Sequence, residues 1–216
     1  MKKITLSLLA LSALTAHSAF AADAFSYAKG AATWAHTKSD FLKDLNSPRD
    51  SESTRDFGGV TLDLSKSFAG NFYGRLGSEY TSRQHGNDGM GIYNAGIGMF
   101  TPLSTGLNLY GEMGAMGYSL ERELAHDVQL QGVRGDAIAR KSSGSLYGEV
   151  GLRYDVGNVE LSTAYRYANM TKDMHDFKVG AAYKLSPAWA LTADYTYRNW
   201  DLQKGSISSL GVKYSF

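Results

Sequence analysis

Residues 146–156, LYGEVGLRYDV, alternate between apolar or small side chains and polar ones almost without a break. Leu146 and Val150 fall on one face of an extended chain, whereas Glu149 and Arg153 fall on the other. A repeat of two residues is typical of a β-strand whose faces meet different environments, and it does not fit the period of a helix. This stretch therefore indicates a β-protein.

The same alternation recurs through most of the chain and predicts an all-β fold of ten antiparallel strands. The predicted strands span residues 25–37, 55–67, 72–83, 90–101, 107–120, 143–156, 159–170, 177–185, 189–200 and 207–216. Short connections with turn-forming residues alternate with long ones, at 38–54, 84–89, 121–142, 171–176 and 201–206. Eight strands remain the alternative if the first pair, which is separated by a long loop, is not fully part of the wall.

The N-terminus has the three parts of an export signal. Lys2 and Lys3 supply the positive charge, residues 4–16 form a short apolar segment, and Ala19-Phe20-Ala21 is an A-x-A cleavage site. We expect cleavage after Ala21, which leaves residues 22–216 as one barrel domain. Loss of the two lysines changes the formal net charge from +1 to −1.

Composition excludes several classes of function. The chain has 22 Lys and Arg against 21 Asp and Glu, and this balance argues against nucleic-acid binding, which usually needs a basic surplus. It has no cysteine, and therefore no disulfide scaffold, thiolate zinc site or thiol nucleophile.

Charged side chains away from the strand ends all fall on the face opposite the apolar row. They are Asp63, Arg75, Glu79, Glu112, Glu149, Arg153, Asp155, Glu160, Arg166, Lys178, Lys184, Asp194, Arg198 and Lys213. Acidic and basic residues are equally represented, whereas an ion-selective pore favours a ring of one sign. We interpret the pattern as a salt-bridged, largely closed lumen, with a narrow passive pore for small solutes as the alternative. In the first strand we expect Trp34 to face outward and Lys29 and Thr33 inward.

The pattern as a whole is that of an up-and-down barrel in an outer membrane. Both chain ends fall on the side of the short turns, and aromatic residues gather near the strand ends. A strand of about 12 residues, tilted ~40°, spans the ~25 Å apolar band of that membrane. We therefore predict a multi-pass transmembrane β-barrel with extracellular long loops.

The C-terminal residues 210–216, LGVKYSF, end in Phe with apolar or aromatic residues at alternate positions. This ending resembles the C-terminal signal of bacterial outer-membrane β-barrels, and the size of the chain is similar to the OmpA, OmpX and opacity type. The resemblance implies a Gram-negative source, passage with periplasmic chaperones and insertion by the barrel-assembly machinery. It also implies that Val212, Tyr214 and Phe216 are the recognised residues.

Enzymatic motifs are incomplete. Asp173 and His175 resemble half of the catalytic centre of omptin proteases, but the matching earlier loop offers only Asn87-Asp88 in place of an Asp-x-Asp pair. His36 with Ser39 is the nearest match to a lipid A hydrolase or acyltransferase pair. We nominate no catalytic residue and expect no enzyme activity.

Four histidines beyond the signal lie at the predicted extracellular ends or loops, but none is spaced as a metal ligand pair: His36, His85, His126 and His175. We therefore expect no metal or cofactor.

The two longest loops carry mixed charge, and functional residues concentrate on loops that a rigid scaffold holds. The candidates for contact with a host or cell-surface ligand, or with lipopolysaccharide, are Phe41, Leu42, Arg49, Arg134 and Arg140. We therefore expect an adhesive or structural surface protein in contact with outer-membrane lipid.

Overall fold

The computed structural model describes residues 24–38, 55–68, 70–82, 89–130 and 133–216; the side chains of Lys38, Arg55 and residues 122–139 lie outside this description. The strands are β1 (Tyr27–Lys38), β2 (Arg55–Phe68), β3 (Phe72–Ser82), β4 (Gly89–Ser104), β5 (Leu107–Leu130), β6 (Val133–Val156), β7 (Val159–Asn169), β8 (Asp173–Lys184), β9 (Trp189–Asn199) and β10 (Lys204–Ser215). The described residues include no helix long and apolar enough to span a membrane.

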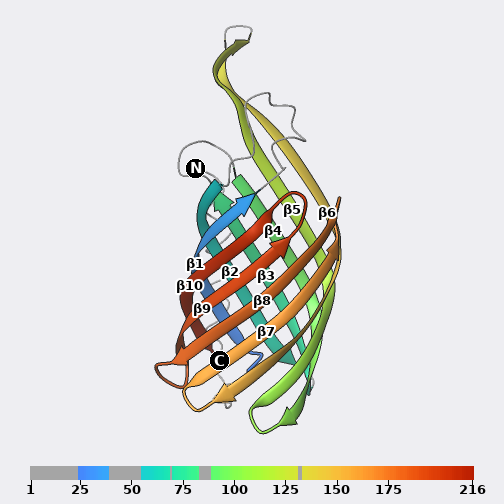
Figure 1. Ribbon diagram of the computed structural model, residues 1–216, viewed down its shortest axis with the longest axis vertical. Helices are drawn as coiled ribbons and strands as arrows, with labels where there is room; N and C mark the ends of the chain where they lie inside the picture. Colours follow the sequence, from blue (N-terminus) through green and yellow to red (C-terminus); the bar gives the residue numbers. More distant parts are fainter. Residues whose placement is uncertain (1–23, 39–54, 69, 83–88, 131–132) are drawn as a thin grey trace.

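The strands form one closed barrel in which each strand pairs antiparallel with its neighbours in the chain (Figure 1). β1 pairs with β10, from Tyr27 opposite Ser215 to Lys38 opposite Lys204, and this pairing closes the wall. The predicted all-β, ten-stranded, up-and-down barrel is confirmed. The eight-stranded alternative is wrong because β1 and β2 pair along their length, from Tyr27 opposite Ser65 to Thr37 opposite Arg55.

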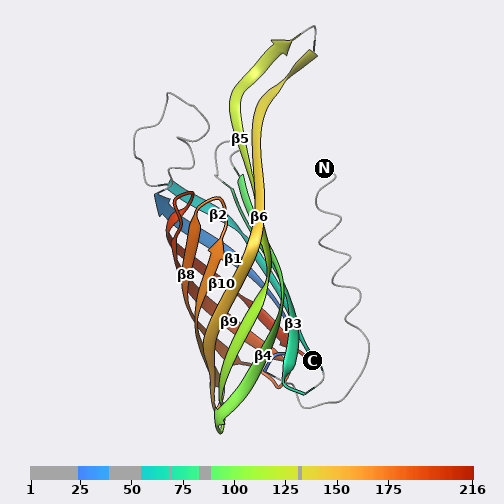
Figure 2. The ribbon, with the colours of Figure 1, turned by 90° about the vertical axis from the view of Figure 1, so that its right-hand side faces the viewer.

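The prediction of a loop at 121–142 is wrong, because β5 and β6 continue pairing as far as Leu130 opposite Val133. The paired backbones form a ribbon that rises well above the rest of the barrel (Figure 2). Register shifts lie between Glu123 and Ala125 and between Ala125 and Val128. The many charges of this segment suggested a loop, but a two-stranded ribbon in water tolerates polar side chains on both faces because its backbone groups bond to each other.

Burial follows the alternation along each strand. Outward apolar side chains such as Met113, which is 73% exposed, form the outer face, whereas inward Tyr147 is only 3% exposed. In β1, Trp34 is exposed and Thr33 is buried. An apolar exterior around a polar interior is the arrangement that a lipid bilayer requires of a barrel.

Glycines make the wall thin where large aromatic side chains lie inside. An added Cβ at Gly98 would come within 2.2 Å of the Tyr73 ring, and one at Gly96 would come within 2.4 Å of the Tyr147 hydroxyl. These glycines therefore let the tyrosine rings lie against the inner wall. A side chain at either position would displace a ring from the lumen.

Candidate functional site

The centre of the lumen is organised around the carboxylate of Glu149, which meets three cations. Arg75 Nη1 lies 3.0 Å from Oε1, and Arg166 Nε and Lys178 Nζ lie 2.6 Å and 2.8 Å from Oε2. Tyr110 also donates its hydroxyl proton to Oε1, at 3.2 Å. These side chains come from β3, β5, β6, β7 and β8, so that one carboxylate ties five strands together.

Arg75 of β3 links this network to carboxylates on β2 and β5. Its Nε and Nη2 donate to the two oxygens of Asp63 at 2.9 Å and 2.6 Å. Its Nη1 also lies 3.7 Å from Oε2 of Glu112, and Tyr147 donates a hydrogen bond to Oε1 of Glu112. A guanidinium has five N–H donors, which suits it to several carboxylates at once.

Two further groups of charges lie on either side of this centre. Towards the extracellular end, Arg198 Nε and Nη2 donate to Asp176 at 2.8 Å and 3.0 Å, and Nη1 lies 2.9 Å from Oε1 of Glu79. Towards the short turns, Glu160 lies 2.6 Å from Lys213 Nζ and 3.7 Å from Arg153 Nε. The lumen is therefore crossed by ion pairs along its length.

The remaining charges of the predicted set are also paired. Asp155 accepts a hydrogen bond from Lys184, and Asp194 lies 3.2 Å from Lys29 Nζ. Each of the fourteen strand charges named from the sequence thus has a partner of opposite sign inside the barrel.

One charged member of the network was missed. Asp176 is buried in β8, although the sequence placed it in a loop because the strand was predicted to begin at Phe177 rather than at Asp173. Asp176 is separated from Lys178 and Lys184 by even numbers of residues, so that all three lie on the same face of the strand. Continuing the alternation towards the start of this strand would therefore have identified it.

An apolar cluster fills the extracellular end of the lumen. Its members are Met90, Ile92, Met116, Tyr118, Leu120, Tyr147, Ala168, Met170, Met174, Trp200 and Leu202. Trp200 is 0% exposed, packs edge-on to Tyr118 with ring centroids 5.0 Å apart, and donates its Nε1 proton to the Lys172 carbonyl at 3.1 Å. The β9–β10 connection therefore places a large aromatic ring inside the barrel instead of in solvent.

An aromatic cluster fills the end at the short turns. Phe25 stacks on Phe100 and Tyr73, with ring centroids 4.2 Å and 4.9 Å away, and meets the edge of Tyr110 at 5.8 Å. The guanidinium carbon of Arg153 lies 4.5 Å from the Phe25 ring centroid, a cation–π contact. The segment that precedes β1 is thus held inside the mouth of the barrel.

A cavity of about 140 Å³ remains between the two clusters. Its lining includes Asp63, Arg75, Glu149, Arg166 and Arg198. A water molecule occupies about 30 Å³ in the liquid, so the cavity has room for a few waters among the ion pairs. The described side chains therefore leave a small polar chamber rather than a wide channel.

The structure describes only part of each incomplete enzymatic motif. Asp173 and His175 lie on β8, where Asp173 accepts a hydrogen bond from Tyr167 at 3.1 Å and His175 Nδ1 lies 2.7 Å from the Tyr165 hydroxyl. Asn87, Asp88 and Ser39 lie outside the described residues.

Among the histidines that follow the predicted signal, the structure describes the side chains of His36 and His175. His36 Nδ1 lies 2.7 Å from Asp56 at the exposed rim. Of the side chains that the structure describes, no three His, Asp or Glu are arranged to hold a metal ion. His85 and the side chain of His126 lie outside this part of the chain.

The structure describes only some of the loop residues predicted to contact a ligand. Phe41, Leu42, Arg49 and the side chain of Arg134 lie outside the described part, and Arg140 lies on β6 with its Nε 3.4 Å from Glu121 across the hairpin.

The C-terminal candidates lie at the short-turn end of β10. Val212 is exposed on the outer face, and the Tyr214 ring lies 6.1 Å from that of Phe216. The backbone N–H of Phe216 donates to the Ser26 carbonyl at 3.2 Å. Their role as an assembly signal remains a prediction.

Comparison with known families finds one match over nearly the whole chain. The family described as outer membrane protein beta-barrel domain matches residues 6–216. A search of curated proteins finds no significant match.

Similar solved structures share little sequence with this chain. The Ail attachment invasion locus protein of Yersinia pestis, solved with the heparin analogue sucrose octasulfate, is 16% identical over 88% of this chain and 97% of its own, with a TM-score of 0.44. The translocator domain of the autotransporter NalP from Neisseria meningitidis is 13% identical over 98% and 94%, with a TM-score of 0.45. The KdgM porin is 11% identical over 88% and 99%, with a TM-score of 0.42.

Proposed function

The chain belongs to the family of outer membrane protein beta-barrel domains, and from this premise we propose that it is a non-enzymatic surface protein whose sealed barrel displays the β5–β6 hairpin outside the cell. Its proposed partners are lipopolysaccharide and a host or cell-surface ligand. The observation that carries the proposal is the paired extension of β5 and β6 beyond the barrel rim (Figure 2).

The proposed sealing rests on three layers inside the lumen. Phe25 and its aromatic neighbours occupy one end, the cluster around Trp200 occupies the other, and the ion pairs around Glu149 lie between them. Ordered ion pairs of both signs support a scaffold better than they support selective conduction, which uses a ring of one sign. A barrel of this kind serves to hold a surface element rigidly.

The proposed interaction surface is the hairpin. Residues 121–141 carry acidic and basic groups in mixed order, including the candidates Arg134 and Arg140. A two-stranded ribbon presents both of its faces to the medium. Its backbone pairing already restricts its conformations, so that less conformational entropy is lost when a ligand binds. Phe41, Leu42 and Arg49 of the first long loop are proposed as additional contacts.

The proposed route to the membrane uses both ends of the chain. We infer export by the signal at residues 1–21 with cleavage after Ala21, followed by periplasmic chaperones and the barrel-assembly machinery. Val212, Tyr214 and Phe216 are the proposed recognition residues.

Shortening the hairpin should separate the barrel from its surface activity. In the test variant, residues 122–139 are replaced by Asn-Gly, so that the Glu121–Arg140 pair becomes the last of the ribbon. We expect an unchanged heat-modifiable barrel on gel electrophoresis, and at least a ~10-fold loss of binding to lipopolysaccharide micelles or cultured epithelial cells, because interface energy concentrates in a few residues.

Conductance of the same refolded preparations tests the sealed lumen. The full-length protein in planar bilayers should show no steady single-channel current. Steady conductance would support the narrow passive pore instead, and undiminished binding by the shortened variant would remove the hairpin as the interaction surface.

A further inference from the structure

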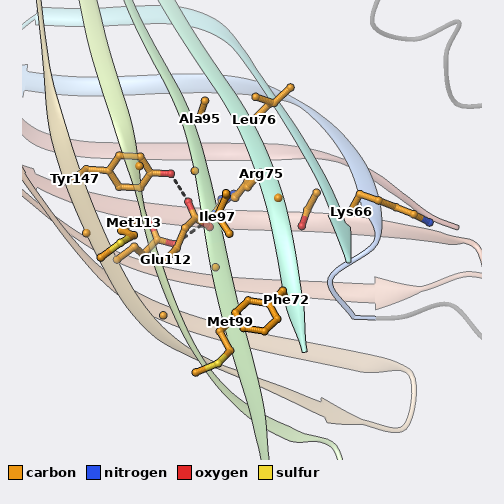
Figure 3. A pocket seen from close by; sticks show the side chains of 18 of the residues that line it. Lys66, Phe72, Arg75, Leu76, Ala95, Ile97, Met99, Glu112, Met113 and Tyr147 are labelled. Carbon is orange, nitrogen blue, oxygen red and sulfur yellow. Dashed lines mark hydrogen bonds and ion pairs between the residues drawn. The ribbon is translucent and has the colours of Figure 1, made fainter. Parts of the chain in front are cut away.

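The outer wall carries an apolar groove that the proposed surface function does not use. The groove has a volume of about 1690 Å³ and runs along the lipid-facing side of β2 to β7 (Figure 3). Its lining includes Phe72, Leu76, Ile97, Met99 and Met113. The Tyr147–Glu112 hydrogen bond marked in Figure 3 belongs to the lumen side of the same wall.

Outward-facing glycines produce the hollow. Gly74, Gly111 and Gly148 line the groove and have no side chain to fill it. In the strand register, Gly111 lies between Met99 and Val150, and Gly148 lies opposite Met113. The larger neighbours therefore stand above a floor of bare backbone. A flexible hydrocarbon chain in such a hollow gains dispersion contacts from below and from both sides, whereas a convex wall offers contacts on one side only.

A single positive charge marks one end of the groove. Lys66 lies on the outer face of β2, is exposed, and its Nζ sits 4.8 Å from the centroid of the Phe216 ring. Both Lys66 and Phe216 are at the end of the barrel where the short turns and the C-terminus lie. Of the side chains that the structure describes, Lys66 is the only charged one on the outer face in this half of the barrel.

In an outer-membrane barrel, the short-turn end faces the periplasm. Lys66 therefore lies at the level of the phospholipid headgroups of the inner leaflet, and an ammonium there attracts a phosphate. Lipid A occupies the opposite leaflet, at the other end of the strands. The groove volume also exceeds the ~300–1,000 Å³ of usual small-molecule pockets, which favours an elongated occupant with more than one chain.

We propose that this groove binds one anionic glycerophospholipid of the periplasmic leaflet, with its acyl chains on the glycine floor and its phosphate on Lys66. The proposal is independent of the hairpin and of the lumen. It concerns a single retained lipid rather than the general solvation of the wall by the bilayer.

The groove can be filled without disturbing the barrel. A Cβ added at Gly111 or Gly148 would meet no atom closer than 4.0 Å, apart from its chain neighbours. The chain variant is therefore Gly148→Leu combined with Gly111→Leu, with Ala181→Leu on the outer face of β8 as its matched control. The charge variant is Lys66→Gln, with Lys66→Arg as the rescue and Lys204→Gln at the opposite end of the barrel as its control.

The experiment is native mass spectrometry of detergent-purified protein titrated with dioleoylphosphatidylglycerol or dioleoylphosphatidylcholine. We expect one tightly retained phosphatidylglycerol on the wild type and both controls, and about a 10-fold weaker retention by the double leucine variant. Lys66→Gln should lose about fivefold in phosphatidylglycerol retention and little in phosphatidylcholine retention, and Lys66→Arg should restore the preference.

Three results would overturn the proposal. Equal retention by the wild type and the double leucine variant would show that the groove is not the site. Retention of lipid A in preference to phosphatidylglycerol would place the ligand in the other leaflet. A dimer that disappears in the double leucine variant would assign the groove to a second copy of the chain.

Discussion

Replacing Glu149 by leucine is expected to destabilise the folded barrel by ~3–5 kcal/mol, the range measured when one partner of a buried ion pair is removed. The carboxylate is almost completely buried and lies within 3.0 Å of Arg75, Arg166 and Lys178. Arg75 would keep Asp63, but the other two cations would lose their nearest counter-charge. Their mutual repulsion would add to the cost of keeping them away from water.

The measurement is equilibrium unfolding by urea in lipid vesicles, followed by tryptophan fluorescence. The control is Asp194→Asn. The Asp194 carboxylate also faces the lumen, but its one cationic partner is Lys29 and its side chain is 29% exposed. We expect this control to lose about 1 kcal/mol or less. A Glu149→Leu barrel as stable as the control would show that the central network is not a main source of stability.

Replacing Trp200 by alanine is expected to destabilise the folded barrel by ~3–5 kcal/mol, as for other buried tryptophans. The ring is completely buried against Tyr118 and its Nε1 proton is bonded to the Lys172 carbonyl, so that the variant loses packing and leaves a carbonyl without its partner. The cavity would open next to the extracellular mouth of the lumen.

The matched control is Trp189→Ala, because Trp189 is 51% exposed on the outer face. Both variants can be compared by urea unfolding in vesicles and by the rate of cleavage of the folded protein by added protease. We expect the Trp200 variant to be the less stable and the more rapidly cleaved. Equal behaviour of the two variants would mean that the apolar cluster does not hold the β9–β10 connection in place.

Local alternation was sufficient to predict the barrel because each face of a strand in a bilayer meets only one environment. Glu149 and Leu146, three positions apart, already assign opposite faces of β6. The same rule placed Lys29 inside, where it lies beside Asp194. Such assignments need no knowledge of distant contacts, since the bilayer makes the same demand on every strand.

Local alternation could not predict features that depend on contacts between residues far apart in the chain. Trp200 lies where the sequence predicts a strand end at the water surface, and only the inward turn of the β9–β10 connection buries it against β5. The β5–β6 extension was missed because its residues are charged. Charged residues are as common in a β-ribbon exposed to water as in a loop, so they do not distinguish the two. Lys66 is near the end of the predicted strand 55–67, and its position beside the groove follows only from the register of β2 with β3.

The pairing of β1 with β10 also has a consequence for the order of assembly. Tyr27 lies opposite Ser215, so that nearly the entire chain separates the two strands that close the wall. Contacts between such remote segments form slowly, because the intervening chain must first be ordered. Until the last strand arrives, β1 presents a free edge with unsatisfied backbone groups, the kind of edge that recruits other chains. A nascent barrel of this design therefore has to be kept from joining its neighbours for as long as its C-terminus is missing.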